Sequence, residues 1–335
     1  MKKRRLLITA VLVITSTFAA AFFAACATGN RGTPPLFVIP EYNPEIDGMR
    51  IGDYVPGKGT LIWRDEFTGT ELDRTRWNPE TGTGNQYGLS DWGNRELQWY
   101  SPDNVFIENG MLVIEARDVR GSPVGDPARH FTSGRITTGQ TRLAPGLEWT
   151  PETFAVTTGR VEGRMRTPRG VGFWPAFWLL GANSYGPVRG HPHMVWPRCG
   201  EIDIMEFFGG REYMLVHAIH FGPHWPENRH RSWNTHLPGE ALFSDGFHVY
   251  GVEWDRHEVR WLLNGEIVHR VGYDQLDDRP GASDWMQNFF NDAGFSIILN
   301  IAIGGNMGMG VPAPESFNGV DNRLTVDWVR VFKQD

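Results

Sequence analysis

Three carboxylates stand close together in the short run Glu201–Glu206, which reads Glu-Ile-Asp-Ile-Met-Glu. The apolar residues of this run predict a β-strand. Strand side chains alternate between faces, so Glu201 and Asp203 share one face while the two isoleucines point into a core. Strict alternation would place Glu206 on the core face, where an ionised carboxylate is very costly. We therefore expect a β-bulge near Met205 that returns Glu206 to the face of the other acids.

This spacing suits the chemistry of a carboxylate pair. The two glutamates lie about four strand steps apart, roughly 13 Å along the backbone. Leaning toward each other over Asp203, they could approach the separation of about 5–5.5 Å that retaining glycosidases use. The alternative is a solvated acidic face. Three acids without an interleaved Lys or Arg repel each other, however, and a purely structural strand gains nothing from that repulsion.

The rest of the chain predicts the elements that must position these acids. Helical periodicity is nearly absent, and Gly, Pro and Asn separate short strand-like segments. Asn264-Gly265 between two apolar runs predicts a type I′ hairpin turn. Many short strands with turn signals predict an all-β, two-sheet sandwich. The predicted strands include residues 111–116, 154–167, 247–254, 295–303 and 324–332.

A strand rich in aromatic residues follows the same logic. Trp174 and Trp178 share one face, whereas Phe173, Phe177 and Leu179 take the other, core-facing side. An exposed pair of indoles suits stacking on the apolar faces of sugar rings. The alternative is that both tryptophans are simply large core residues, since Trp is usually well buried.

Residues 199–209 resemble the active-site strand of glycoside hydrolase family sixteen. The extra residue before the last Glu is typical of its laminarinase (endo-β-1,3-glucanase) branch. The resemblance covers about residue 58 to the end and implies a concanavalin-like jelly roll whose concave sheet forms a substrate cleft. Other stretches that match the family in order are 63–67, 94–98, 132–135, 172–178, 220–222, 247–254, 299–305 and 326–331.

The resemblance implies retaining endo-hydrolysis of a β-1,3-glucan by double displacement, without a cofactor. Glu201 matches the nucleophile and Glu206 the acid/base, while Asp203 would hydrogen-bond and orient Glu201. Two carboxylates this close cannot both ionise freely, so we expect a raised pKa and a proton on Glu206. The residues matched to substrate binding are Asn94, Arg95, Trp174, Trp178 and His220. Trp196, Trp225 and Trp233 flank the expected cleft in sequence and are further substrate-binding candidates, for outer subsites.

A structural calcium ion on the convex side is a further implication of the resemblance. Its matched ligands are the backbone carbonyls of Glu66 and Gly110 and the side chain of Asp327. Oxygen donors of this kind suit calcium. Asp327 could equally be an ordinary exposed strand residue.

Two other readings of the function stay open. One is a hydrolase of the same family that acts on mixed-linkage β-glucan or on an agar-type galactan. The other is a non-catalytic carbohydrate-binding lectin, because the jelly roll hosts both kinds of protein and a fold does not fix a function. The bulged strand counts against the unbulged lichenase form, and the three intact carboxylates count against a pure binder.

The first 26 residues predict export. The basic segment Met1–Arg5 precedes an apolar run, as in a bacterial export signal. The run ends in Phe-Ala-Ala-Cys26, which resembles a lipoprotein box, although Phe23 departs from the usual aliphatic residue. Signal cleavage without lipidation and an uncleaved anchor are the alternatives. All three export the domain from the cytoplasm. We expect a cell-envelope lipoprotein or a secreted protein.

Composition bounds the partners of the exported chain. Without the four basic residues of the signal, 28 of the 32 Lys and Arg remain against 39 Asp and Glu, a net charge of −11. This charge argues against nucleic acid and anionic lipid as partners, so only an N-terminal lipid would reach a membrane. Residues 27–57 are predicted to be a Pro/Gly-rich tether and 58–335 one catalytic domain, which we expect to be monomeric.

The chain contains two cysteines, and one of them is Cys26 in the predicted signal. The exported domain would therefore hold Cys199 alone and have no disulfide. Cys199 lies two residues before Glu201, but little in its sequence neighbourhood would lower its pKa, so we expect an inert packing thiol rather than a nucleophile.

Overall fold

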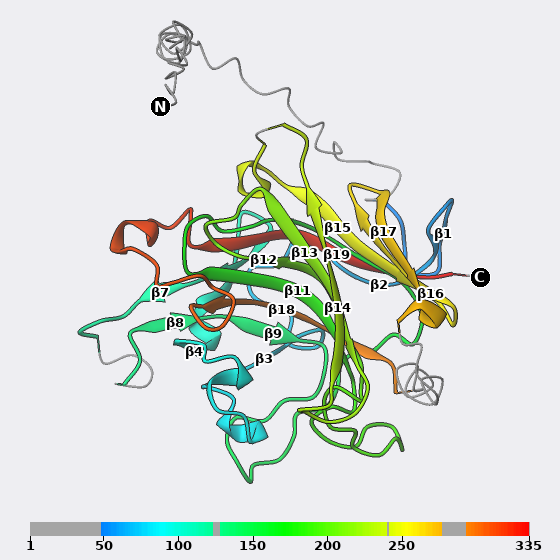
Figure 1. Ribbon diagram of the computed structural model, residues 1–335, viewed down its shortest axis with the longest axis horizontal. Helices are drawn as coiled ribbons and strands as arrows, with labels where there is room; N and C mark the ends of the chain where they lie inside the picture. The colour runs from blue at the N-terminus through cyan, green and yellow to red at the C-terminus, as the bar shows by residue number, and fades with distance from the viewer. Residues whose placement is uncertain (1–47, 123–127, 240, 277–292, 335) are drawn as a thin grey trace, which may run out of the picture. The chain divides into compact units, whose positions relative to one another are not determined.

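The computed structural model describes residues 48–122, 128–239, 241–276 and 293–334 (Figure 1). The predicted export signal and most of the predicted tether lie outside these ranges. Within them, no helix is long and apolar enough to cross a membrane. The helices of the described residues are short 3-10 turns: η1 (Asn85–Tyr87), η2 (Asp91–Gly93), η3 (Pro102–Asn104), η4 (Phe243–Asp245), η5 (Tyr273–Gln275) and η6 (Pro314–Ser316).

Two antiparallel sheets form the domain, as the strand pattern predicted. The larger sheet has the order β1-β2-β19-β10-β15-β16-β17, and the hairpin β5–β6 extends it through a pairing of β6 with β19. Its strands are β1 (Tyr54–Val55), β2 (Gly59–Asp65), β5 (Val105–Glu108), β6 (Met111–Glu115), β10 (Gly159–Arg166), β15 (His248–Trp254), β16 (Glu258–Leu263), β17 (Glu266–Gly272) and β19 (Arg323–Lys333).

The second sheet carries the strands that matter for function, in the order β14-β13-β12-β11-β18-β9-β3. Its strands are β3 (Asn78–Pro79), β9 (Arg135–Thr137), β11 (Phe173–Gly181), β12 (Glu201–Phe207), β13 (Met214–Phe221), β14 (Arg229–His236) and β18 (Phe295–Ile303). A small third sheet consists of β4 (Gln98–Tyr100), β7 (Arg117–Asp118) and β8 (Phe131–Ser133).

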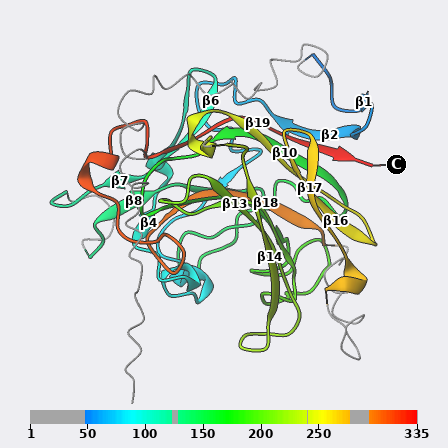
Figure 2. The same ribbon diagram turned by 45° about the horizontal axis from the view of Figure 1, so that its top comes forward.

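The core lies between the two large sheets, which Figure 2 shows as separate layers, with β2, β10 and β19 above β13 and β18. As predicted, Phe173, Phe177 and Leu179 of β11 are fully buried in this core. Asn264 and Gly265 have positive φ angles of 52° and 88° and join β16 to β17, which confirms the predicted hairpin turn. The predicted strand 154–167 is shorter than expected and begins only at residue 159.

Part of the predicted tether belongs to the domain. Tyr54 and Val55 pair with the beginning of β2, and the Val55 side chain is buried against Leu61 and Phe332. The boundary predicted at residue 57 is therefore too late. The sequence pattern missed it because a two-residue strand with one buried side chain leaves almost no periodic signal.

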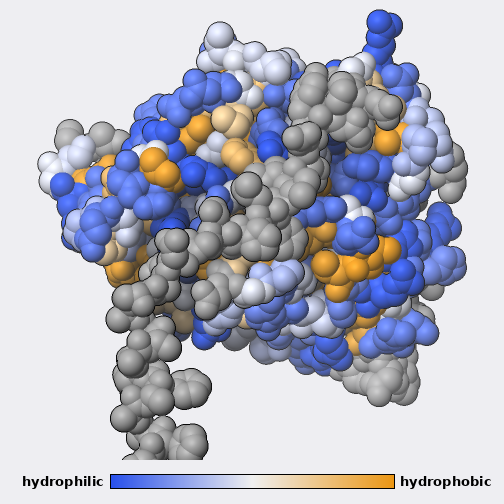
Figure 3. Space-filling view, turned by 90° about the horizontal axis from the view of Figure 1, so that it is seen from above, coloured by the Kyte–Doolittle hydropathy of each residue, from blue (hydrophilic) through white to orange (hydrophobic). Residues whose placement is uncertain are grey.

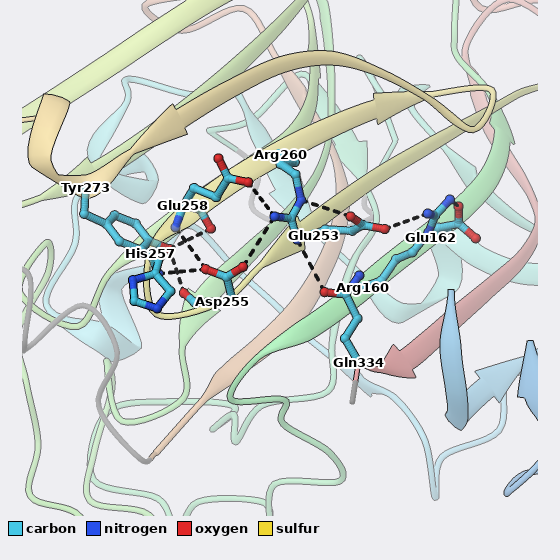
Figure 4. A network of polar contacts seen from close by, with 9 residues as sticks. All are labelled: Arg160, Glu162, Glu253, Asp255, His257, Glu258, Arg260, Tyr273 and Gln334. Carbon is cyan, nitrogen blue, oxygen red and sulfur yellow. Dashed lines mark hydrogen bonds and ion pairs between the residues drawn. The ribbon is translucent and has the colours of Figure 1, made fainter. Parts of the chain in front are cut away.

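A network of charged side chains covers part of the larger sheet (Figure 4). Arg160 donates to Glu253 at 2.7 Å and also pairs with Glu162, which accepts from Lys58 at 2.6 Å. Arg260 joins the network through Glu253 at 3.1 Å. Burial favours the neutral acid, but the charges of Lys58 and Arg160 outweigh it and hold the pKa of Glu162 below its ordinary value. The face in Figure 3 is mainly hydrophilic, with apolar residues in small separate groups.

Candidate active site

The predicted bulge is present in β12. Asp203 pairs with Trp178 of β11, and Met205 pairs with the next residue, Phe177, so one residue of β12 is extra. The register with β13 shifts at the same place, between Asp203 and Glu206. Both residues between those two acids, Ile204 and Met205, are fully buried in the core. The bulge thus confirms that Glu206 returns to the face of Glu201 and Asp203.

Two donors stabilise the bulge from behind. A bulge frees backbone groups, and a buried carbonyl without a partner is costly. The indole of Trp261, on β16 of the opposite sheet, donates to the Asp203 carbonyl at 2.9 Å. The ring nitrogen Nδ1 of His217 lies 2.8 Å from the Ile204 carbonyl and satisfies it. The position of the three acids therefore depends on the second layer of the sandwich.

Glu201 lies at the start of β12 between an indole and an imidazole. Trp196 donates its indole N–H to Glu201 Oε2 at 2.9 Å, and Nε2 of His220 lies 3.5 Å from Oε1. Burial and the charge of Asp203 raise the pKa of Glu201 to about 7, against the opposing effect of His220. Glu201 is thus a carboxyl group that changes its charge near neutral pH.

Glu206 has a more apolar setting. Its Oε1 accepts the indole N–H of Trp174 at 3.1 Å. Burial is again the largest cause, followed by the charge of Asp203, and together they raise the pKa of Glu206 to about 8. The raised pKa expected for Glu206 is therefore present, and the structure adds that the pKa of Glu201 is raised as well, though less.

Asp203 and His220 form the third part of the cluster. Asp203 is buried, and its Oδ2 lies 3.3 Å from Nε2 of His220. Burial alone would lower the pKa of His220, but Glu201, Asp203 and Glu206 outweigh it and raise this pKa to about 9. No hydrogen bond joins Asp203 to Glu201 in the described part of the chain, so the predicted direct contact is wrong. Asp203 instead acts on Glu201 through charge and through His220.

The two predicted platform tryptophans lie beside the acids, but they are less exposed than expected. Trp174 is only 8% exposed because Phe208, Met214 and Val216 enclose it. Trp178 is half-buried and donates its indole N–H to Asn300 Oδ1 at 2.8 Å. The prediction of two open indoles is therefore wrong for Trp174. Strand alternation identifies the face of a side chain but not the neighbours that cover it.

Sequence reasoning gave no role to Arg135, although it lies in a matched stretch. Its guanidinium lies between two indoles, 4.3 Å from the Trp92 ring and 4.9 Å from the Trp178 ring. It also pairs with the buried Glu80 and donates to the Tyr185 hydroxyl at 3.2 Å. The buried Arg135 cation therefore packs against one face of the Trp178 ring and fixes its position. A basic residue inside an otherwise buried short strand was the only signal that could have suggested it.

Asn94 and Arg95 directly follow η2, and the Asn94 carbonyl accepts from the N–H of Asn306, which lies after β18. Asn94 donates to Glu96 at 3.3 Å, while Arg95 is exposed and makes no hydrogen bond or ion pair with any described residue. Glu96 is buried and accepts from Tyr100 at 3.1 Å, and Tyr100 in turn accepts from Asn300 at the same distance. Because Asn300 also accepts from the Trp178 indole, one chain of hydrogen bonds joins this loop to Trp178, which pairs with Asp203.

The other three tryptophans that were predicted to bind substrate have different surroundings. Trp196 touches Glu201, as described above, and the side chain of Trp225 is 74% exposed. Trp233 stacks on His269 with ring centroids 4.2 Å apart and packs against Trp261, on the core side of β14. The outer-subsite prediction is therefore wrong for Trp233.

Cys199 is buried among apolar side chains, including Leu180 and Ile298. Burial and the nearby charge of Glu201 raise the pKa of its thiol far above neutral pH. A thiol that stays protonated is a poor nucleophile, which supports a packing role.

The predicted calcium ligands lie on neighbouring segments of the larger sheet, but the Asp327 carboxylate already forms an ion pair with Arg164. Val326 of β19 pairs with Leu112 and Val329 with Asp65, so Asp327 lies beside the segments that hold Gly110 and Glu66. Asp327 Oδ2 accepts from Arg164 at 2.6 Å, and a cation would have to share this carboxylate. The oxygen donor set suits calcium, and the ion stays a prediction.

Comparisons with known proteins agree with this geometry. A model of the glycosyl hydrolases family 16 matches residues 140–287. Glucan endo-1,3-beta-glucosidase of Cryptopygus antarcticus is 35% identical over 289 residues, which cover 83% of this chain and 93% of that protein. Glucan endo-1,3-beta-glucosidase A1 of Niallia circulans is 34% identical over 87% of this chain, which spans only 39% of that longer protein.

Among solved structures, the laminarinase catalytic domain from Thermotoga maritima MSB8 is similar with a TM-score of 0.65 and 35% identity. The match covers 83% of this chain and 99% of that one. The sandwich fold, the acidic bulged strand and these relatives together define a glycoside hydrolase. The chain belongs to family 16 of the glycosyl hydrolases, in its laminarinase-like branch.

Proposed function

We propose that the chain is a retaining endo-hydrolase that cleaves β-1,3-glucan of the laminarin type by double displacement. The observation that carries the proposal is the bulge of β12, which presents Glu201 and Glu206 on one face, each oriented by a tryptophan N–H. The relatives described above, named as glucan endo-1,3-beta-glucosidases and a laminarinase, support the substrate class.

In the first step, Glu206 protonates the glycosidic oxygen while the Glu201 carboxylate attacks the anomeric carbon. The carbon–oxygen bond to the leaving sugar breaks, and a covalent glycosyl ester forms on Glu201. The charges favour this division of roles. Glu201 has the lower pKa and lies 3.5 Å from the His220 ring, whose positive charge stabilises the carboxylate.

In the second step, Glu206 is a carboxylate and takes a proton from water, which attacks the anomeric carbon. The ester bond to Glu201 breaks, Glu201 leaves as a carboxylate, and Glu206 regains its proton. Two inversions leave the β-configuration unchanged. Trp196 holds Glu201 through both steps because its N–H can donate to the carboxylate and to the ester oxygen.

The decisive experiment follows laminarin hydrolysis by NMR during the first minutes. We expect the β-anomer of the new reducing end to appear first and the α-anomer only later, by mutarotation. Initial release of the α-anomer would mean inversion, a carboxyl separation nearer the roughly 6.5–9.5 Å that admits a water, and no nucleophile at position 201.

A substrate panel separates this proposal from its alternatives. Laminarin, lichenan and agarose are incubated with the chain, and the length of the products is measured. Laminarin cleaved first into oligosaccharides of mixed length supports endo-β-1,3-glucanase action. Preference for lichenan or agarose would assign the other family activities, and tight binding of laminarin without cleavage would assign a lectin.

A further inference from the structure

The side chains of Glu201, Asp203 and His220 have the arrangement of metal ligands. One donor atom from each of them lies within 4.8 Å of the others. The cluster results from the register of two strands, since Glu201 of β12 pairs directly with His220 of β13. Asp203 lies two residues after Glu201 on the same face of β12. It completes a set of one nitrogen and two oxygen donors.

Two of the three donor separations fit a small transition-metal ion, and the third lies within 4.8 Å. Zinc bonds to nitrogen and oxygen ligands are about 2.0–2.1 Å long, which makes the edge of a tetrahedron about 3.3–3.4 Å. Nε2 of His220 lies 3.3 Å from Asp203 Oδ2 and 3.5 Å from Glu201 Oε1. An imidazole with two carboxylates suits zinc and its neighbours in the series rather than calcium or magnesium, which prefer oxygen alone.

Two independent features of the surroundings also point to a ligand. The Asp203 side chain is only 5% exposed, and its Oδ2 has no hydrogen-bond partner among the described residues although it faces His220. The positive charge of His220, 3.3 Å away, neutralises this oxygen, and an ion that replaces the proton of His220 would have to supply the same charge. The Trp196 N–H holds Oε2 of Glu201, which leaves Oε1 directed at His220 in the way that an outer-shell donor orients a metal ligand.

We propose that Glu201, Asp203 and His220 form a zinc-type transition-metal site that blocks the cleft when it is filled. The ion binds to Nε2 of His220 in place of a proton, which passes to the solvent, and to one oxygen of each carboxylate. Sugar and metal are then mutually exclusive, because the ion occupies the oxygen with which Glu201 would attack. This consequence rests on the proposed function, whereas metal binding itself does not.

The test is calorimetric titration of the full chain with zinc chloride alone, in wild type and three variants. We expect one ion per chain in wild type and a Kd raised at least about tenfold in His220→Gln and in Asp203→Asn. The matched control is His230→Gln, because His230 stacks on His220 with ring centroids 5.6 Å apart but does not belong to the cluster. This variant should bind zinc as wild type does.

Equal binding by all four proteins, or loss in His230→Gln alone, would mean adventitious binding to surface histidines and would overturn the proposal. Absorption of bound Co²⁺ gives a second readout, which shows tetrahedral coordination only if the cluster folds normally. Laminarin oligosaccharides should weaken zinc binding in proportion to their own occupancy. If the chain binds zinc through His220 but never cleaves laminarin, the metal site stands and the proposed function fails.

Discussion

At the scale of the residue, the two candidate catalytic glutamates are almost equivalent by sequence. Each is a Glu on the same face of β12, and each accepts one indole N–H. Their neighbours distinguish them, because Glu201 lies beside His220 whereas Glu206 accepts from Trp174, which belongs to an apolar cluster. The nearer positive charge makes Glu201 the better carboxylate and leaves the proton on Glu206.

The nucleophile assignment predicts unequal losses. Glu201→Gln should abolish laminarin turnover, because no other side chain can form the glycosyl ester, whereas Asp203→Asn should leave measurable kcat. Azide should restore turnover to Glu201→Ala and yield a glycosyl azide of inverted configuration. Equal losses in the two variants, or no rescue, would speak against Glu201.

The charge cluster predicts a bell-shaped pH profile. Activity needs Glu201 ionised and Glu206 protonated, so kcat/KM should rise through a pKa of about 7 and fall through about 8. His220 lowers both pKa values while it is charged. Its replacement in His220→Gln should therefore move both limbs to higher pH. The exposed His257 is the control, and His257→Gln should leave the profile of hydrolysis rate against pH unchanged.

At the scale of the element, one irregularity in β12 decides the geometry of the site. The bulge lets Ile204 and Met205 both enter the core and turns Glu206 back to the cleft. Partners outside the strand stabilise the freed carbonyls, and one of them, Trp261, belongs to the opposite sheet. Packing between layers is thus coupled to the alignment of the acids.

This coupling predicts that Trp261→Phe lowers kcat although Trp261 lies in the opposite sheet and does not touch the substrate. The substitution keeps the aromatic ring but leaves the Asp203 carbonyl without its donor, at a cost of about 1–3 kcal/mol in unfolding free energy. Because small displacements of reacting groups are costly, we expect kcat to fall about tenfold or more. Denaturation and steady-state kinetics measure the two effects.

Trp254→Phe is the matched control for this variant. Trp254 is also fully buried and donates to a backbone carbonyl, that of Thr157, at 2.9 Å, but away from the bulge. It should lose similar stability and keep its kcat. Parallel loss of kcat in both variants would show a general loss of folding rather than a role of the bulge.

At the scale of the whole domain, the larger sheet packs against the sheet that carries the three acids and contains a network of buried charges. Lys58 joins the segment before β2 to Glu162 in the middle of the sheet. Arg160 links Glu162 to Glu253 (Figure 4). A buried ion pair gives little net stability, but removal of one partner leaves a buried charge uncompensated.

This network predicts acid sensitivity. The pKa of Glu162 is lower in the folded than in the unfolded chain, so its contribution to stability is present above about pH 4.3 and is lost as the pH falls below it. Glu162→Gln should lower the unfolding free energy at pH 7 by about 3 kcal/mol and make it less dependent on pH in the acid range. Guanidinium denaturation at pH 7 and pH 4 measures both effects, and the exposed Glu266→Gln should change neither.

Local patterns were enough to predict the all-β sandwich, the Asn264-Gly265 turn and the bulge. Each of these follows from short-range rules, since strand alternation, turn conformation and the cost of a buried acid concern neighbouring residues. The face shared by Glu201, Asp203 and Glu206 was determined by sequence alone for the same reason.

Only the tertiary structure decided which side chains surround that face. Burial of Trp174, the position of Trp233 on the core side, and the placement of Arg135 under Trp178 all depend on residues distant in sequence. The pairing of Asp203 with His220 rather than with Glu201 is set by the register between β12 and β13. Sequence periodicity carries the direction of a side chain, whereas burial, charge environment and pKa depend on the contacts that folding brings together.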